Sequence, residues 1–278
     1  GVEPQSETVW RQADKYDVPR IAFVNKMDRV GADFFNVMHM VKDRLGASPL
    51  PVVIPIGSGE MFTGIVDLIT MKAILYNEST MGSRFDEADI PSDMIEISEK
   101  WRKHLIEETA TYDENLLEKF ISDEEISEDE LRSALRKGCL DNTFIPMFCG
   151  SAFKNKGVQR LLDAVVDFLP SPVDIGEVKG TTPRDSDTEL SRLPSVDEPF
   201  SALAFKIMTD PYVGKLTYMR VYSGRLESGS YVYNASNGKK ERISRVLLMH
   251  SNKREDRDKV EAGEIVAAVG LKNVKTGH

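Results

Sequence analysis

Residues 20–28 run Arg-Ile-Ala-Phe-Val-Asn-Lys-Met-Asp, and they join a continuous apolar segment to a polar loop. A short apolar run of this kind is typical of a parallel strand that is buried on both faces. An apolar stripe at helical spacing follows over 34–45, and Gly46 is suited to end that helix. Because open α/β sheets bind ligands outside the carboxyl ends of their strands, Asn25-Lys26-Met27-Asp28 is a candidate binding loop.

The residue types of this loop match the edge of guanine. An ionised carboxylate such as Asp28 only accepts hydrogen bonds, so it can take both the N1–H and the exocyclic N2–H of guanine, a pair that adenine does not supply. The aliphatic stem of Lys26 can lie along the base, and Asn25 can tie the loop to neighbouring loops. The competing interpretation is a polar turn in which Asp28 caps the helix that follows.

A second candidate loop has the same setting. Cys149-Gly150-Ser151-Ala152-Phe153 follows another apolar run and precedes a clearly amphipathic helix. Its small residues would let the backbone approach a ligand closely, and the amide of Ala152 could donate to guanine O6 with Ser151 beside it. Phe153 is bulky and apolar, so it could cover the plane of the base. Taken alone, the segment is equally well interpreted as a tight strand-to-helix turn.

Composition limits the class of protein. The 278 residues are enough for two or three domains, and 41% hydrophobic with 29% charged residues is ordinary for a globular protein. No apolar run approaches the roughly 20 residues of a membrane span. The two cysteines, Cys139 and Cys149, form no CxxC pair, which argues against a disulfide framework or a zinc ribbon. The expected location is cytoplasmic.

The charge is unevenly distributed. The net charge is −9, which weighs against a protein that coats nucleic acid. Residues 78–130 hold 18 Asp and Glu against 5 Lys and Arg, or −13, so the remainder carries +4. The acidic stretch is either a solvated helical surface or a docking face for a basic or mixed partner. The basic residues over 239–259 are likewise either a solvated rim or an RNA-facing surface.

Periodicity divides the rest of the chain. Strands and a hairpin are predicted first and acidic helices next, over 51–57, 62–69, 72–76, 90–111, 113–121 and 127–137, with a capping box at Ser127. After a Pro- and Gly-rich stretch, strands are predicted over 200–209, 215–223, 230–234, 241–249 and 264–269. Short strands separated by frequent turns favour a small antiparallel β-barrel.

The two loops together resemble the NKxD and SA base-recognition motifs of translation GTPases. The stretches 1–8, 62–68, 150–159 and 199–206 narrow the resemblance to the elongation factor G family, and it covers essentially the whole chain. The 126-residue separation of Asn25 and Ser151 (151 − 25) resembles the inserted subdomain of that family.

The resemblance implies a multidomain α/β plus β protein. It has a partial P-loop-GTPase-type parallel sheet, an inserted acidic α+β subdomain and a following β-barrel of the domain II type. The expected parts are the first piece of the GTP-binding domain at 1–46, the insert at 47–141 and the last piece of the GTP-binding domain at 142–172. A linker at 173–198 and a truncated barrel at 199–278 are expected to follow.

The resemblance also implies a function. The parent protein would bind GTP and GDP with Mg²⁺ and hydrolyse GTP on the ribosome, driving movement of transfer and messenger RNA. Its base-binding residues would be Asn25, Lys26, Asp28, Ser151, Ala152 and Phe153. Ribosomal RNA and ribosomal proteins would be its partners, with the stalk protein at the acidic insert and no membrane.

Two motifs of the family are absent from these residues. There is no G-x-x-x-x-G-K-[ST] to cradle phosphates and hold Mg²⁺, and no Asp-Thr-Pro-Gly-His segment. The four histidines do not cluster as metal ligands. The expectation is an excised piece of a GTPase that contains no catalytic residue, is itself inactive and binds no cofactor alone. Ribosome-protection and release-factor-recycling GTPases, and a noncatalytic adaptor module, remain alternatives.

Overall fold

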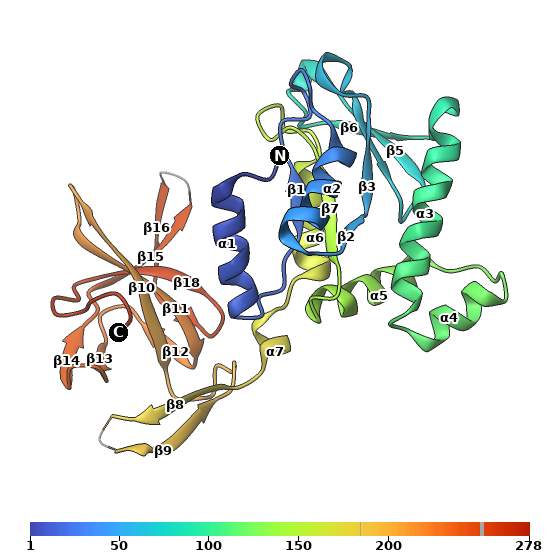
Figure 1. Cartoon of the computed structure of the whole chain (residues 1–278). Helices are drawn as coiled ribbons and strands as arrows, with labels where there is room; N and C mark the ends of the chain where they lie inside the picture. Colours follow the sequence, from blue (N-terminus) through green and yellow to red (C-terminus); the bar gives the residue numbers. More distant parts are fainter. Residues whose placement is uncertain (184, 251–252) are drawn as a thin grey trace. The chain divides into compact units, whose positions relative to one another are not determined.

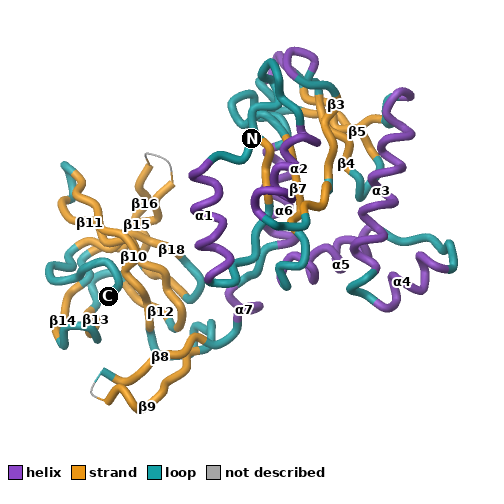
Figure 2. Tube along the Cα trace, in the orientation of Figure 1, coloured by secondary structure: helices purple, strands orange, loops and turns teal. Residues whose placement is uncertain are grey.

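The computed structural model describes residues 1–183, 185–250 and 253–278. The chain forms two compact units, Gly1–Leu169 and Pro170–His278. Figure 1 follows the chain through both, and Figure 2 shows that the described helices belong to the first unit except for the short α7 (Pro172–Ile175).

A three-stranded parallel sheet is the base of the first unit. Its order is β1-β7-β2, with β1 at Ala22–Val24, β7 at Ile145–Cys149 and β2 at Pro49–Pro51. The helices that belong with it are α1 (Pro4–Lys15), α2 (Phe34–Leu45) and α6 (Val158–Phe168). All five residues of the central strand β7 are buried, and both predicted apolar runs are confirmed as parallel strands.

The helix after β1 is fixed at both ends by its sequence. The carboxylate of Asp33 accepts from the Asn36 amide at 2.9 Å, so Asp33 is the N-cap. Gly46 ends α2 with φ +64, as predicted. Asp28, the N-cap of the competing interpretation, lies outside this cap and remains available in its loop.

Residues 52–144, between β2 and β7, are called the insert here. Its elements are an antiparallel sheet in the order β3-β4-β5-β6 and three helices, at β3 Val53–Ile56, β4 Gly64–Asp67, β5 Lys72–Tyr76, β6 Phe85–Ala88, α3 Ile95–Ala110, α4 Glu114–Ile121 and α5 Glu128–Leu140. Three short 3₁₀ turns lie between them, at Gly59–Met61, Glu78–Thr80 and Ser92–Met94. The predicted hairpin and acidic helices are confirmed.

The strand with a turn predicted over 51–57 is present as β3, and a separate strand that was not predicted, β2, precedes it. Pro49–Pro51 pairs in parallel with β7 as an edge strand, where a missing proline N–H costs no ladder bond. After Val52, whose amide still bonds the Met147 carbonyl at 3.0 Å, the chain joins the antiparallel sheet as β3. A run of apolar residues does not indicate that the chain passes from one sheet to another.

The insert and the parallel sheet share one hydrophobic core. Buried residues from both make up a single cluster, among them Phe34, Leu50, Ile54, Ile65, Leu105, Leu135, Phe148 and Phe168. The two free cysteines, Cys139 in α5 and Cys149 in β7, are buried in the same cluster. Burial raises the pKa of both thiols, that of Cys139 to about 11.

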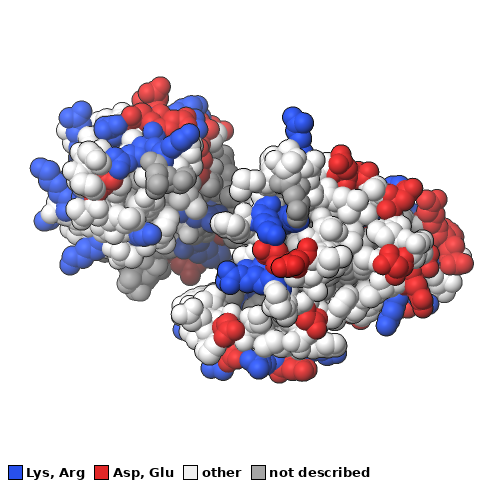
Figure 3. Space-filling model, turned by 90° about the horizontal axis from the view of Figure 1, so that it is seen from above, with Lys and Arg blue, Asp and Glu red and all other residues white. Residues whose placement is uncertain are grey.

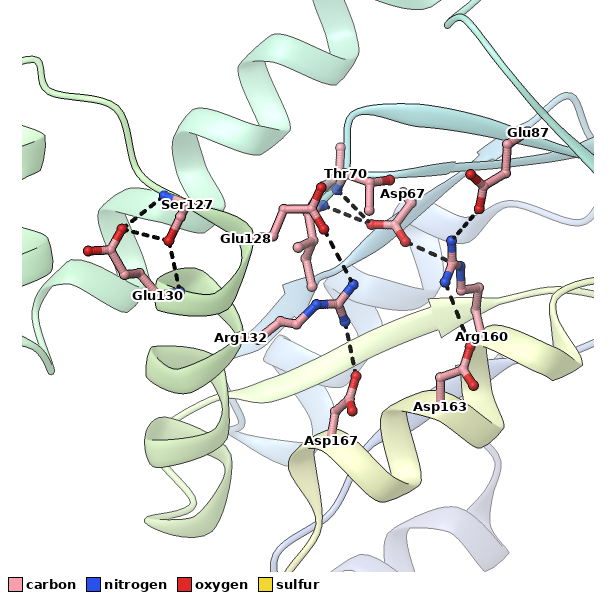
Figure 4. A network of polar contacts seen from close by, with 12 residues as sticks. Asp67, Thr70, Glu87, Ser127, Glu128, Glu130, Arg132, Arg160, Asp163 and Asp167 are labelled. Atoms are coloured by element: carbon pink, nitrogen blue, oxygen red, sulfur yellow. Dashed lines mark hydrogen bonds and ion pairs between the residues drawn. The ribbon is translucent and has the colours of Figure 1, made fainter.

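Ion pairs also join the insert to α6 (Figure 4). Arg160 of α6 lies 3.3 Å from the buried carboxylate of Asp67 and 3.0 Å from that of Glu87. Arg132 of α5 donates to Asp167 at 3.0 Å. Because Asp67 is held at the end of β4 by the Ile69 amide, these contacts fix the insert sheet against the helix that follows the second candidate loop.

The capping box of α5 is formed as predicted. The Ser127 hydroxyl accepts from the Glu130 amide at 3.3 Å, and the Glu130 carboxylate accepts from the Ser127 amide at 2.9 Å. The hydrogen bond from Lys119, with the Ser127 contacts, lowers the pKa of Glu130 to about 2. Glu130 therefore contributes its stabilisation above the ordinary carboxyl pKa, and this is lost as the pH falls toward about 2.

The second unit is built from antiparallel ladders. The largest has the order β10-β11-β18-β15-β16, at Ser201–Asp210, Gly214–Ser223, Ile265–Val269, Arg245–His250 and Lys253–Arg257. Three two-stranded ladders accompany it, β12 (Arg225–Glu227) with β17 (Lys259–Glu261), β13 (Tyr231–Asn234) with β14 (Lys239–Arg242), and β8 (Val178–Thr182) with β9 (Asp185–Arg192). Antiparallel pairing is confirmed.

Two features of this unit differ from the predictions. The stretch 241–249 is divided between β14 and β15. The first of these strands pairs with β13, whereas the Ser244 amide bonds the Val269 carbonyl at 2.8 Å and β15 pairs with β18. The stretch 173–198, predicted as a linker, contains α7 and the hairpin β8-β9. Its Pro, Gly, Ser and Asp content favours loops, so propensity alone did not predict these strands.

Within the described ranges, no helix is both long and apolar enough to cross a membrane.

Replacing Ser127 by Ala tests the capping box. We expect Ser127→Ala to lower the free energy of unfolding by about 1 kcal/mol, since one amide of the first turn of α5 loses its partner. Both tryptophans, Trp10 and Trp101, lie in the first unit, so urea unfolding followed by their fluorescence measures this unit. The exposed Ser133 of the same helix supplies the control, Ser133→Ala, for which we expect a change below about 0.5 kcal/mol.

Candidate functional site

Parallel pairing of β1 and β7 brings the two candidate loops together. The Gly150 amide donates to the Val24 carbonyl at 3.0 Å, and the Gly150 carbonyl accepts from the Met27 amide at 3.0 Å. The ladder thus continues past the last strand residues into both loops. Residues that are more than 120 positions apart in the sequence become neighbours at the carboxyl edge of the sheet.

Asn25 links the loops directly. Its side-chain Oδ1 accepts from the backbone amide of Lys26 at 2.8 Å and from that of Ala152 at 2.9 Å. The first contact supports the left-handed conformation of Lys26, which has φ +66. The second holds the amide that was predicted to meet a base. The predicted tie between the loops is therefore present in the structure.

Asp28 is oriented toward the second loop. Hydrogen bonding by the side chain of the buried Ser151 is the main reason that the pKa of Asp28 lies below its usual value. The positive charges of Lys154 and Arg29 act in the same direction. At neutral pH the carboxylate is ionised and accepts hydrogen bonds only.

The remaining predicted residues line the outside of this pair of loops. Lys26 and Ala152 are exposed, and the side chain of Phe153 is 89% exposed. Phe153 therefore makes little contact with the rest of the chain, which leaves it available to a ligand. The structure brings Asn25, Lys26, Asp28, Ser151 and Ala152 to one edge, with Phe153 at its margin.

The second loop is a closed turn. Ser151 and Lys156 exchange two backbone hydrogen bonds of 2.9 Å, and the Asn155 amide bonds the Ala152 carbonyl at 3.2 Å. Gly150 precedes the turn in a crowded position, where an added Cβ would lie 2.1 Å from the Lys156 carbonyl oxygen and 2.8 Å from the Phe23 ring. Only glycine fits there.

Sequence reasoning missed the residues that support the loops from the insert side. The buried ammonium of Lys156 donates to the Phe62 carbonyl at 2.9 Å. The Gly59 amide donates to the Met27 carbonyl at 2.8 Å. No motif marks these residues, because the partner of Lys156 is the backbone carbonyl of a residue distant in the sequence.

The surface charges outside this site are partly paired. In the basic region of the second unit, Arg245 forms two bonds of 2.8 Å to Asp256, and Arg254 bonds Asp210. In the first unit, Figure 3 shows acidic side chains gathered over the end that carries the insert. Across the parts of the chain that the structure describes, no three His, Cys, Asp or Glu side chains gather as metal ligands.

Comparison with known proteins agrees with this geometry. Residues 1–171 match the family model for the elongation factor Tu GTP binding domain, and residues 214–278 match that for elongation factor Tu domain 2. A crystal structure of a protein from Thermus thermophilus is similar, with a TM-score of 0.80 and 25% sequence identity. The match covers 100% of this chain and 38% of that one, so this chain spans well under half of its neighbour's length.

Gly150→Ala tests the close approach of the loops. We expect the variant to lower the free energy of unfolding of the first unit by about 1–3 kcal/mol, because the added methyl meets a backbone oxygen that cannot move aside cheaply. Tryptophan fluorescence during urea unfolding provides the measurement.

The control is Gly180→Ala in β8. Gly180 also has a φ outside the left-handed region, and an added Cβ there has nothing within 4 Å. We expect a change below about 0.5 kcal/mol in unfolding followed by circular dichroism. A Gly150→Ala variant as stable as the wild type would contradict the predicted crowding.

Proposed function

This chain belongs to the translation elongation factor GTPases, and on that premise we propose that its two linked loops recognise the guanine base of GTP and GDP. The observation that supports this most strongly is the pair of contacts across the loops. Asn25 bonds the Ala152 amide at 2.9 Å, and the side chain of Ser151 lowers the pKa of Asp28. A turn that merely capped a helix would need neither contact.

Asp28 and Ala152 supply complementary halves of the recognition. The Asp28 carboxylate accepts from N1–H and N2–H of guanine, while the Ala152 amide donates to O6. Adenine carries a donor where guanine has O6 and no N–H at position 1, so it would leave both protein groups unpaired. An unpaired group in a closed site costs about 1–3 kcal/mol, which gives strong rejection.

Binding of the base involves Asn25. In the structure, the Ala152 amide already donates to Asn25 Oδ1 at 2.9 Å. A guanine O6 would therefore share this amide with Asn25 or replace it. The side-chain amide of Asn25 is held close to the base in either case, while the stem of Lys26 and the exposed ring of Phe153 cover the base faces.

We further propose that the chain is part of a ribosomal translocase of the elongation factor G type. The 126-residue separation of Asn25 and Ser151 (151 − 25) supports this, because a simple GTPase needs only about 30 residues between these two loops, and the insert accounts for most of the excess. In this proposal the whole protein hydrolyses GTP on the ribosome, in the cytoplasm, and moves transfer and messenger RNA. The acidic surface of the insert meets the ribosomal stalk protein.

The family uses Mg²⁺ with the nucleotide. The bound metal ion neutralises charge at the phosphates. The described residues offer no set of metal ligands for it. In this proposal the residues of the two loops contact the base rather than the phosphates or the metal.

Asp28→Asn, made in the whole protein of which this chain is proposed to be part, tests base recognition. We expect GDP affinity to fall about 10- to 100-fold, because the variant loses charged hydrogen bonds worth about 1.5–3 kcal/mol. Affinity for xanthosine diphosphate should rise, since the new amide can donate to xanthine O2. Competition binding with both nucleotides measures the change in preference.

Asp43→Asn is the matched control, since Asp43 is an exposed residue of α2 and the chemical change is the same. It should bind both nucleotides as the wild type does. A GDP preference that survives in Asp28→Asn would refute the assigned role of the carboxylate.

We also expect these 278 residues alone to release no phosphate from GTP above the uncatalysed rate. The sequence contains no G-x-x-x-x-G-K-[ST] loop to hold the β- and γ-phosphates. A phosphate-release assay beside a complete translation GTPase checks this, and comparable turnover by the two would overturn it.

A further inference from the structure

The insert contacts both base-recognition loops. Gly59 bonds the Met27 carbonyl of the first loop, and Phe62 accepts from Lys156 at the end of the second. The third contact is made by Gly82, which lies in the turn between β5 and β6. These three contacts come from separate parts of the insert, so the loops rest on it over an extended area.

Gly82 is the contact that leaves no room for a side chain. A Cβ added there would lie 2.4 Å from the Lys154 carbonyl oxygen and 2.7 Å from that of Asn155, both in the turn that carries Ala152. Gly82 also has φ +69, which favours glycine. Its own carbonyl accepts from the Gln159 side chain at 3.0 Å, which locks it against the start of α6.

The turn it touches is stiff. The two bonds between Ser151 and Lys156 close the turn, and the bond from Asn155 to Ala152 crosses it. A displacement of the Lys154 or Asn155 carbonyl is therefore passed to the Ala152 amide rather than absorbed. The position of that amide decides how well it meets O6, because hydrogen bonds weaken steeply with misalignment.

We propose that Gly82 is a positioning residue for guanine recognition, which sets the Ala152 amide from the insert side of the turn. The inference rests on the proposed function, because it needs the Ala152 amide to contact the base. It makes the insert a structural part of the nucleotide site, and it assigns a role in base specificity to a residue that contacts no nucleotide.

The experiment compares Gly82→Ala with Gly46→Ala. Gly46 lies in the same unit and has a similar φ of +64, but an added Cβ there has nothing within 4 Å. The control therefore carries the same backbone strain without pressure on the turn. Because the chain contains no phosphate loop, the base contacts act alone and bind weakly, so the 278-residue chain is titrated with GDP and with ADP up to millimolar concentrations and the amide resonance of Ala152 is followed by NMR.

We expect Gly82→Ala to bind GDP about tenfold more weakly, to lose part of its GDP-over-ADP preference, and to shift the Ala152 resonance in the free chain. Gly46→Ala should stay within twofold of the wild type in GDP affinity and leave that resonance in place. Equal GDP affinity and equal Ala152 resonances in the two variants would overturn the role of Gly82.

Gln159→Ala tests the positioning role of Gly82 if Gly82→Ala fails to fold. It removes the bond to the Gly82 carbonyl and adds no atom, so we expect a GDP affinity about threefold lower and a smaller shift of the same Ala152 resonance. If both the GDP affinity and the Ala152 resonance stay unchanged in Gln159→Ala, the proposal is overturned. A wild-type chain without GDP-over-ADP preference overturns the proposed function and this inference with it, whereas a preference that Gly82→Ala and Gln159→Ala retain overturns the inference alone.

Discussion

The hydrogen bonds of Gly150 to the end of β1 and to the loop that follows it are the interaction on which the site depends. Its amide and carbonyl bond Val24 and Met27, so the parallel ladder extends beyond the strands into two loops that are far apart in the sequence. Asn25 then bonds the Ala152 amide across the same gap. Glycine is required because the approach leaves no room for a side chain. This register also places Ser151 where its side chain lowers the pKa of Asp28.

Much of the fold could be predicted from local patterns. The apolar runs before Asn25 and Gly150 predicted parallel strands, and the capping box at Ser127 began its helix where expected. The partners of several strands could not be predicted, because an apolar run carries no information about which neighbour it bonds. Pro49–Pro51 and Val53–Ile56 are the clearest case, since one continuous pattern serves two different sheets.

The candidate site divides in the same way. Asn25, Asp28, Ser151 and Ala152 could be found from the sequence because their chemistry is local and their spacing follows two strands. Lys156 and Gly82 could not, because each acts through the backbone of a residue distant in the sequence. The insert sheet is fixed to α6 through the buried Asp67 and through Arg160, and neither residue belongs to a recognisable motif. Tertiary contacts of this kind lie outside what residue patterns encode.

The burial of Cys139 and Cys149 has a practical consequence for observing this molecule. Thiolates are the reactive form of cysteine, and burial keeps both groups protonated and covered. Both lie in the first unit, and the sequence of the second contains no cysteine. The rate at which an alkylating reagent modifies the chain therefore measures opening of the first unit, and it does not respond to unfolding of the second.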